Sequence, residues 1–111
     1  MPGVPELSPT EFAARWPSYA TGDDVVLLDV REHDELALAA VDGALHIPMR
    51  EIPARIADLD SGKPLVVMCH SGGRSRRVAE FLQQNGFSSV FNLKGGIEAW
   101  SAQIDSRVPR Y

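Results

Sequence analysis

The sequence predicts an α/β domain in which a small parallel sheet is flanked by helices on both faces. Short apolar runs that suit strands alternate with segments of helical spacing, and this order favours parallel strands joined by helices. Two of the expected strands, at residues 25–30 and 65–69, contain uninterrupted apolar runs at residues 25–28 and 65–69, which are typical of strands buried on both faces. The length of 111 residues, 44% of them hydrophobic, suffices for one globular core. Residues 1–111 are therefore interpreted as one domain without repeats or linkers.

A helix is expected to begin near Ser8, ahead of the first long strand. Ser8 can cap it, Pro9 suits the first helical position, and Glu11 stands where a capping box needs an acid. Pro17 ends this helix, and a polar loop then leads to the strand at residues 25–30.

Shorter elements are expected in the middle of the chain. Residues 32–40 are rich in Glu, Leu and Ala and favour a short helix, whereas residues 43–47 favour a short strand that Pro48 closes. Residues 53–59 favour another short helix, and a turn then enters the buried strand at residues 65–69.

The last third of the chain continues the alternation. A helix is expected at residues 75–84, a strand at residues 90–93 and a final helix at residues 97–102. Gly86 can adopt the left-handed conformation that ends a helix, and Phe87 can then pack back against it.

Charge and cysteine content exclude several classes of protein. A net charge of −4 argues against a general nucleic-acid binder, and no apolar run is long enough to span a membrane. A single cysteine excludes an internal disulfide and any multi-cysteine zinc or iron–sulfur site. His33 and His46 lack metal-ligand spacing, so neither a metal nor another cofactor is expected. The first residues contain no basic start followed by an apolar stretch, so a cytoplasmic protein without a signal peptide is expected.

The most informative segment follows the strand at residues 65–69 and precedes the helix at residues 75–84. It reads Cys69, His70, Ser71, Gly72, Gly73, Arg74, Ser75. The carboxyl ends of parallel strands border the ligand crevice of such sheets, and Cys69 stands at one of these ends. Gly72 and Gly73 permit the unusual backbone angles of an anion-binding loop, and the following helix adds unpaired N–H donors. Ser71 and Ser75 can add hydroxyl donors, and Arg74 adds positive charge.

A cysteine inside such a loop is expected to ionise more readily than a free one, and its thiolate is a nucleophile. The same donors would stabilise a negative charge on a sulfur atom added to it. The alternative is a buried structural cysteine followed by a turn, since cysteine is among the most buried residue types. That alternative leaves the two glycines, the two hydroxyls and the arginine unexplained.

Four segments in order resemble the rhodanese-type sulfurtransferases. They are the loop Cys-x-x-Gly-x-Arg-Ser at residues 69–75, Leu-Leu-Asp-Val-Arg-Glu at residues 27–32, Gly-Ala-Leu-His-Ile-Pro at residues 43–48, and Leu-Lys-Gly-Gly-Ile-Glu-Ala-Trp at residues 93–100. The motif-bearing part covers about residues 8–102, nearly the whole chain. Ala39-Ala40-Val41 departs from the pattern, because family members often have Gly-His-Ile there.

The resemblance implies a single rhodanese-like domain of the thiosulfate sulfurtransferase type. It implies that Cys69 accepts a sulfane sulfur from a donor such as thiosulfate, becomes a persulfide, and passes the sulfur to cyanide or a thiol. His70, Ser71, Gly72, Gly73, Arg74 and Ser75 carry over as the loop that binds substrate and persulfide. No cofactor, nucleic acid or membrane is implied, and a protein persulfide donor or acceptor is an open partner.

Two other functions stay open at this point. The domain can act as a persulfide carrier or interaction module for a dedicated partner protein. A loop of this kind also serves Cys-dependent phosphatases and arsenate reductases, which resemble Cys-x5-Arg. Here Arg74 gives Cys-x4-Arg, and Ser75 occupies the position where a phosphatase needs its arginine.

Several charged residues near the predicted crevice have two interpretations each. Asp29 and Arg31 can form a buried ion pair that supports the loop, which we favour over direct binding of the donor by Arg31. Glu35 is interpreted as a solvated helix residue, and the side chain of His70 as one that points away from the thiolate. Arg76 and Arg77 either steer anions or form a solvated face, and the tail at residues 103–111 is interpreted as surface.

Overall fold

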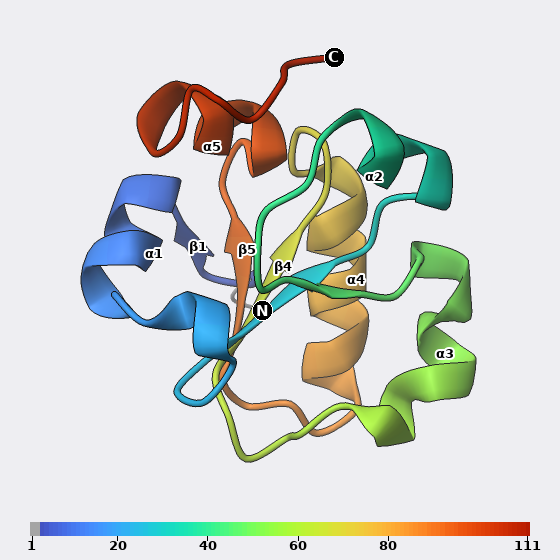
Figure 1. The fold of residues 1–111 in the computed structure, drawn as a ribbon. Coiled ribbons are helices and arrows are strands. Elements are labelled where there is room, and N and C mark those ends of the chain that lie inside the picture. The colour runs from blue at the N-terminus through green and yellow to red at the C-terminus, as the bar shows by residue number, and fades with distance from the viewer. Residues whose placement is uncertain (1–2) are drawn as a thin grey trace.

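The computed structural model describes residues 3–111 and contains a five-stranded parallel sheet in the order β1-β5-β4-β2-β3 (Figure 1). The strands are β1 (Glu6–Leu7), β2 (Val26–Asp29), β3 (Leu45–His46), β4 (Leu65–Met68) and β5 (Val90–Leu93). The expected α/β fold with a small parallel sheet is confirmed. Met1 and Pro2, on which the expectation about a signal peptide partly rests, lie outside the described residues.

Residues 3–111 form five α-helices and three short 3-10 helices, all of which connect strands except the last α-helix, which follows β5. They are α1 (Pro9–Arg15), η1 (Tyr19–Thr21), α2 (His33–Leu38), η2 (Met49–Glu51), α3 (Ile52–Arg55), η3 (Ile56–Asp58), α4 (Gly73–Gln84) and α5 (Gly96–Gln103). No helix within residues 3–111 has the length and apolar character needed to cross a membrane.

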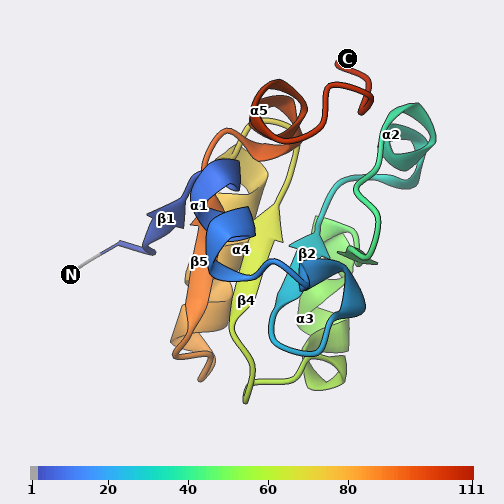
Figure 2. The same cartoon turned by 60° about the vertical axis from the view of Figure 1, so that its left-hand side comes forward.

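Helices cover both faces of the sheet, and each face has its own apolar cluster. Strand β4 is entirely buried, and its side chains alternate between the two clusters. Val67 packs on the side of α3 and α4, where it joins Ile52 and Val78. Val66 packs on the opposite side with Phe12 of α1. Figure 2 shows α1 and α4 on opposite sides of the strands.

Local sequence signals explain the ends of several elements. Ser8 caps α1 and forms both bonds of a capping box with Glu11, as expected. Gly86 has a φ of 93° after α4, and the N–H of Phe87 returns to the carbonyl oxygen of Leu82. The helix expected at residues 53–59 is instead divided into α3 and η3.

The carboxyl ends of the strands meet at one edge of the sheet. The loop after β4, helix α2 and the last residues of the chain lie there, at the top of Figures 1 and 2. The start of α5 reaches the same loop, since the N–H of Ile97 donates to the carbonyl oxygen of Cys69 (2.9 Å). This edge therefore brings four distant segments together around the cysteine.

Candidate active site

Cys69 directly follows the central strand β4, and only 1% of its surface is exposed. The N–H of Gly72 lies 3.1 Å from Sγ, and the hydroxyl of Ser75 lies 3.3 Å from it. Burial raises the pKa of the Cys69 thiol, but hydrogen bonds from the Ser75 hydroxyl and from the backbone of Ser75, Gly72 and Ser71 lower it by more. The pKa of this buried thiol therefore lies below the ordinary cysteine value, which distinguishes it from an inert structural cysteine.

The two glycines of the loop differ in their conformations. Gly72 has a φ of 112°, which a residue with a side chain rarely adopts, and this turn aims its N–H at the sulfur. Gly73 begins α4 and has no positive φ, so the expectation that both glycines are needed for unusual backbone angles is wrong for Gly73.

The start of α5 supports the cysteine loop from one side. The N–H groups of Ile97 and Glu98 donate to the carbonyl oxygens of Cys69 and His70, at 2.9 and 3.2 Å. Gly96 has a φ of 59°, and a Cβ atom there would lie 2.4 Å from the carbonyl oxygen of Cys69. The pair Gly95-Gly96 therefore permits close contact between two backbones, which explains this part of the motif at residues 93–100.

Ser75 is fully buried, and its hydroxyl also lies 2.5 Å from Oδ1 of Asn92 on β5. Asn92 is itself only 1% exposed, and its Nδ2 donates to Glu6 and to the carbonyl oxygen of Gly72. We did not expect Asn92 at the site from the sequence, although an amide within a short apolar strand was an available signal.

Arg74 forms a bidentate ion pair with Glu35 of α2, with N–O distances of 2.6 and 2.9 Å. Only 16% of the Glu35 side chain is exposed, so its interpretation as a solvated helix residue is wrong. Hydrogen bonds from Arg74 lower the pKa of Glu35 to about 2. The guanidinium of the loop itself is thus held by a carboxylate.

The tail at residues 103–111 is mostly exposed, as interpreted, but its last residue contacts the site region. The ring of Tyr111 stacks on His70 with centroids 4.1 Å apart, and its hydroxyl lies 2.8 Å from Oε2 of Glu35. Val108 is buried, and its carbonyl oxygen accepts from Ser101 on α5. His70 also lies 3.5 Å from Glu98, so both contacts hold its ring outside the sulfur's hydrogen-bonding shell.

Asp29 and Arg31 form a buried ion pair at the end of β2, with Nη2 and Oδ2 2.7 Å apart. The guanidinium also donates to the carbonyl oxygen of Ala39 and to the hydroxyl of Tyr111. Because Arg31 is 0% exposed, this geometry favours the supporting role over contact with a donor. Ala39 replaces the glycine of the family pattern, and its carbonyl oxygen accepts a hydrogen bond from Arg31 of this pair.

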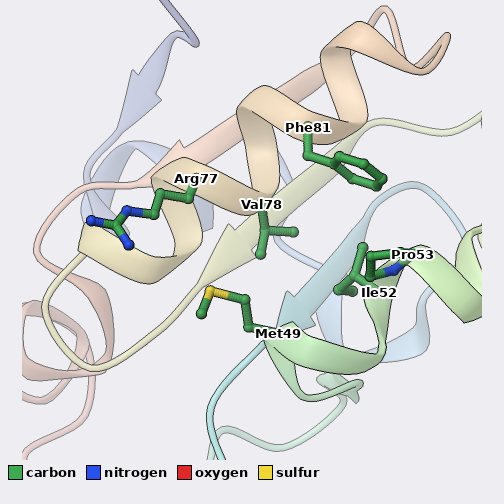
Figure 3. A pocket seen from close by; sticks show the side chains of 6 residues that line it. All are labelled: Met49, Ile52, Pro53, Arg77, Val78 and Phe81. Carbon is green, nitrogen blue, oxygen red and sulfur yellow. The ribbon is translucent and has the colours of Figure 1, made fainter.

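Arg76 and Arg77 take separate positions on α4. Arg76 lies 3.3 Å from Glu6, so an acid offsets its charge. Arg77 borders an open apolar pocket of about 120 Å³ and is directed away from Phe81 (Figure 3). The pocket lies between α4 and the η2–α3 segment and is lined by Met49, Ile52, Pro53, Arg77, Val78 and Phe81.

Within residues 3–111, no three or more His, Cys, Asp or Glu side chains are gathered where they could hold a metal ion. The rings of His33 and His46 meet edge to face, and Nε2 of His46 lies 2.6 Å from the carbonyl oxygen of Arg31.

The arrangement can hold a nucleophilic sulfur and an anionic adduct on it. Its donors toward Sγ are backbone N–H groups and one hydroxyl. Such donors stabilise a charge that develops on sulfur without needing a neighbouring base.

The chain matches the family described as "Rhodanese-like domain" over residues 17–103. It is 39% identical over 82 residues to a sulfurtransferase of Allochromatium vinosum, covering 74% of this chain and 77% of that protein. It is 40% identical over 93 residues to the Arabidopsis thaliana rhodanese-like/PpiC domain-containing protein 12, chloroplastic, covering 80% of this chain. The chain spans only 31% of that Arabidopsis protein.

Solved structures show the same fold. The crystal structure of a rhodanese-like domain protein from Staphylococcus aureus superposes with a TM-score of 0.77 and 28% identity. The match covers 87% of this chain and 91% of the S. aureus chain.

Proposed function

The chain belongs to the rhodanese-like domain family, and we propose on this premise that it is a sulfurtransferase whose Cys69 carries sulfane sulfur as a persulfide. The observation that carries the proposal is the set of donors around Sγ of Cys69 at the carboxyl end of the central strand. These donors favour the thiolate, which is the reactive form of the residue.

The proposed reaction has two displacements. In the first, the Cys69 thiolate attacks the outer sulfur of a donor such as thiosulfate, and a sulfur–sulfur bond forms. The bond between that sulfur and the rest of the donor breaks, so sulfite, or a thiolate from a persulfide donor, leaves with the electron pair. In the second, cyanide or a thiolate attacks the outer sulfur, and Cys69 leaves as a thiolate again. The cycle needs no added oxidant or reductant.

Loop residues 70–75 are proposed to hold the persulfide mainly through their backbone. The N–H groups of Ser71, Gly72 and Ser75 already act on the Cys69 sulfur, and the Ser75 hydroxyl adds a fourth donor. Asp29 and Arg31 are proposed to support the loop from the neighbouring strand end.

The partners are proposed to be a small-molecule sulfur donor and a thiol or cyanide acceptor, with a protein persulfide donor or acceptor as the carrier alternative. The protein is also proposed to be cytoplasmic. A single cysteine that must remain a thiol suits a reducing compartment.

Phosphate-ester hydrolysis is disfavoured by the position of Arg74. A phosphatase loop of this type places its arginine on the oxyanion, whereas both outer nitrogens of Arg74 bond to Glu35. The spacing from Cys69 to Arg74 is also one residue shorter than that pattern.

The proposal is tested by measuring thiocyanate formation from cyanide, with thiosulfate and glutathione persulfide as alternative donors. Turnover with either donor is expected for the native chain, and Cys69→Ser is expected to be inactive with both. Cys69→Ser should also retain the native circular dichroism spectrum. Hydrolysis of an aryl phosphate that Cys69→Ser abolishes, without thiocyanate formation by the native chain, would overturn the proposal.

A further inference from the structure

Asn92 lies on β5 next to the cysteine loop and is buried, although it is polar. In the sheet it stands beside Glu6 of β1, and its amide nitrogen donates to Oε2 of Glu6 at 3.0 Å. The same nitrogen donates to the carbonyl oxygen of Gly72 at 3.2 Å, while Oδ1 lies 2.5 Å from the Ser75 hydroxyl. Asn92 thus connects the first strand with the loop that holds the nucleophile.

These contacts fix which way the amide of Asn92 faces. A carboxylate oxygen and a backbone carbonyl oxygen can only accept, so the amide nitrogen must face Glu6 and Gly72. The amide oxygen then necessarily faces Ser75 and can only accept from its hydroxyl.

Ser75 has one hydroxyl proton and two acceptors within reach. Its oxygen lies 2.5 Å from Oδ1 of Asn92 and 3.3 Å from Sγ of Cys69. One proton can serve only one of them fully at a time. While Cys69 is a neutral thiol, the closer amide oxygen is the better acceptor, and the lone pairs of Ser75 face the thiol. When Sγ carries a negative charge, the sulfur becomes the stronger acceptor.

We propose that Asn92 is a positioning residue that directs the Ser75 hydroxyl proton away from Cys69 until the sulfur becomes negatively charged. The proposal rests on the proposed function only in taking Cys69 as the reacting thiol. During the proposed cycle, the proton of Ser75 turns to Sγ whenever Cys69 is a thiolate.

Charged side chains around the thiol are paired with one another. Arg74 of α4 pairs with Glu35 of α2, Arg76 of α4 with Glu6 of β1, and His70 of the loop lies near Glu98 of α5. Within residues 3–111, none of these paired side chains is among the groups that hydrogen-bond to Sγ. The Ser75 hydroxyl is therefore the side-chain group whose orientation acts most directly on the sulfur.

The first test uses the native chain, so that folding of a variant is not a condition. The side-chain amide signals of Asn92 are followed by ¹⁵N NMR across a pH titration, beside the alkylation rate of Cys69 by iodoacetamide. The amide signals are expected to titrate with the same midpoint as the alkylation rate, and to stop titrating in Ser75→Ala. Amide signals that stay constant through the ionisation of Cys69 would overturn the proposal.

The second test removes the amide acceptor with Asn92→Leu, or with Asn92→Ala if the leucine variant does not fold. Gly72 keeps the N–H of Arg76 as a partner for its carbonyl oxygen, so no backbone group is orphaned. Alkylation below neutral pH is expected to be about threefold to tenfold faster than in the native chain, because Ser75 then donates to the sulfur alone. Asn85→Leu is the control, since Asn85 caps α4 at its far end and its amide donates to Phe81.

A double-variant cycle separates this role from a merely structural one. In a Ser75→Ala background, removal of the Asn92 amide is expected to leave the alkylation profile unchanged, because the shared proton is absent. Slower alkylation in the Asn92 variant than in the native chain would contradict the proposal. So would a change in alkylation rate of equal size in the native and Ser75→Ala backgrounds. The alkylation readout does not require sulfur transfer, so a failure here is distinguishable from failure of the proposed function.

Discussion

At the scale of single residues, the Cys69 sulfur depends on the backbone angle of Gly72. Its φ of 112° turns the N–H toward Sγ, at 3.1 Å, while the following Gly73 takes ordinary helical geometry. The two adjacent glycines therefore provide a matched comparison, in which only one holds a conformation that a side chain opposes.

We predict that Gly72→Ala slows persulfide formation by about tenfold to hundredfold, because the loop loses a donor that favours the Cys69 thiolate. The strained backbone should also lower the free energy of unfolding by about 1–3 kcal/mol. Gly73→Ala should change neither quantity appreciably, since a Cβ atom there meets nothing within 4 Å. Stopped-flow loading and urea unfolding measure both, and equal effects at the two positions would contradict the account.

Glu35 controls the charge that Arg74 can offer to a donor. We predict that Glu35→Gln lowers the KM for thiosulfate by roughly tenfold, because the guanidinium becomes available to the dianion. Glu32→Gln removes the same charge from a residue that pairs with Arg50 instead, and it should leave the KM unchanged. A KM that rises or stays constant in Glu35→Gln would show that Arg74 does not meet the donor.

The same carboxylate predicts a pH dependence of stability. The pKa of Glu35 is lowered from 4.5 to about 2, chiefly by the hydrogen bonds from Arg74. A lowered folded-state pKa adds stability above the unfolded value, and this stability is lost as pH falls from about 4.5 toward 2. Urea unfolding should therefore show a steeper loss in this window for the native chain than for Glu35→Gln, whereas parallel curves would contradict the assignment.

At the scale of elements, the first turn of α5 holds the cysteine loop mainly through backbone hydrogen bonds. Gly96 stands where a Cβ atom would lie 2.4 Å from the carbonyl oxygen of Cys69, and Gly22 has a similar positive φ with open space around it. The two glycines differ mainly in whether a neighbouring backbone is close.

We predict that Gly96→Ala displaces the loop and reduces sulfur loading by about tenfold or more, as expected when a reacting group is misplaced. Gly22→Ala should share the cost of the backbone angle but keep native loading. Loading kinetics on the two folded variants check this, and unchanged loading in Gly96→Ala would remove the supporting role of α5.

Elements with local signals were predictable from the sequence, whereas the network around the site was not. The capping box of Ser8 and the continuous apolar run of β4 act within a few residues, and both elements are found where expected. Strand β1 has only two residues and forms by pairing with β5, so no local periodicity in the sequence predicts it. Asn92 and Glu35 acquire their roles from partners distant in the chain, on β1 and α4.

At the scale of the whole molecule, the site is assembled from segments that are far apart in sequence. Tyr111 connects three of them, because it stacks on His70, accepts from Arg31 and donates to Glu35. The tail thereby braces α2 against the cysteine loop across the edge where the strands end. The loop is thus held by the start of α5 and by the tail, which keeps the buried thiol aligned with its donors.

The central claim is that Cys69 takes up and releases one sulfur atom, and an intact-mass spectrum tests it most directly. Reduced, folded protein is measured before and after thiosulfate or glutathione persulfide, and again after cyanide. We predict a gain of the mass of one sulfur atom that is absent in Cys69→Ser and is lost with cyanide as thiocyanate appears. A folded, reduced protein that gains no sulfur from either donor would contradict the account.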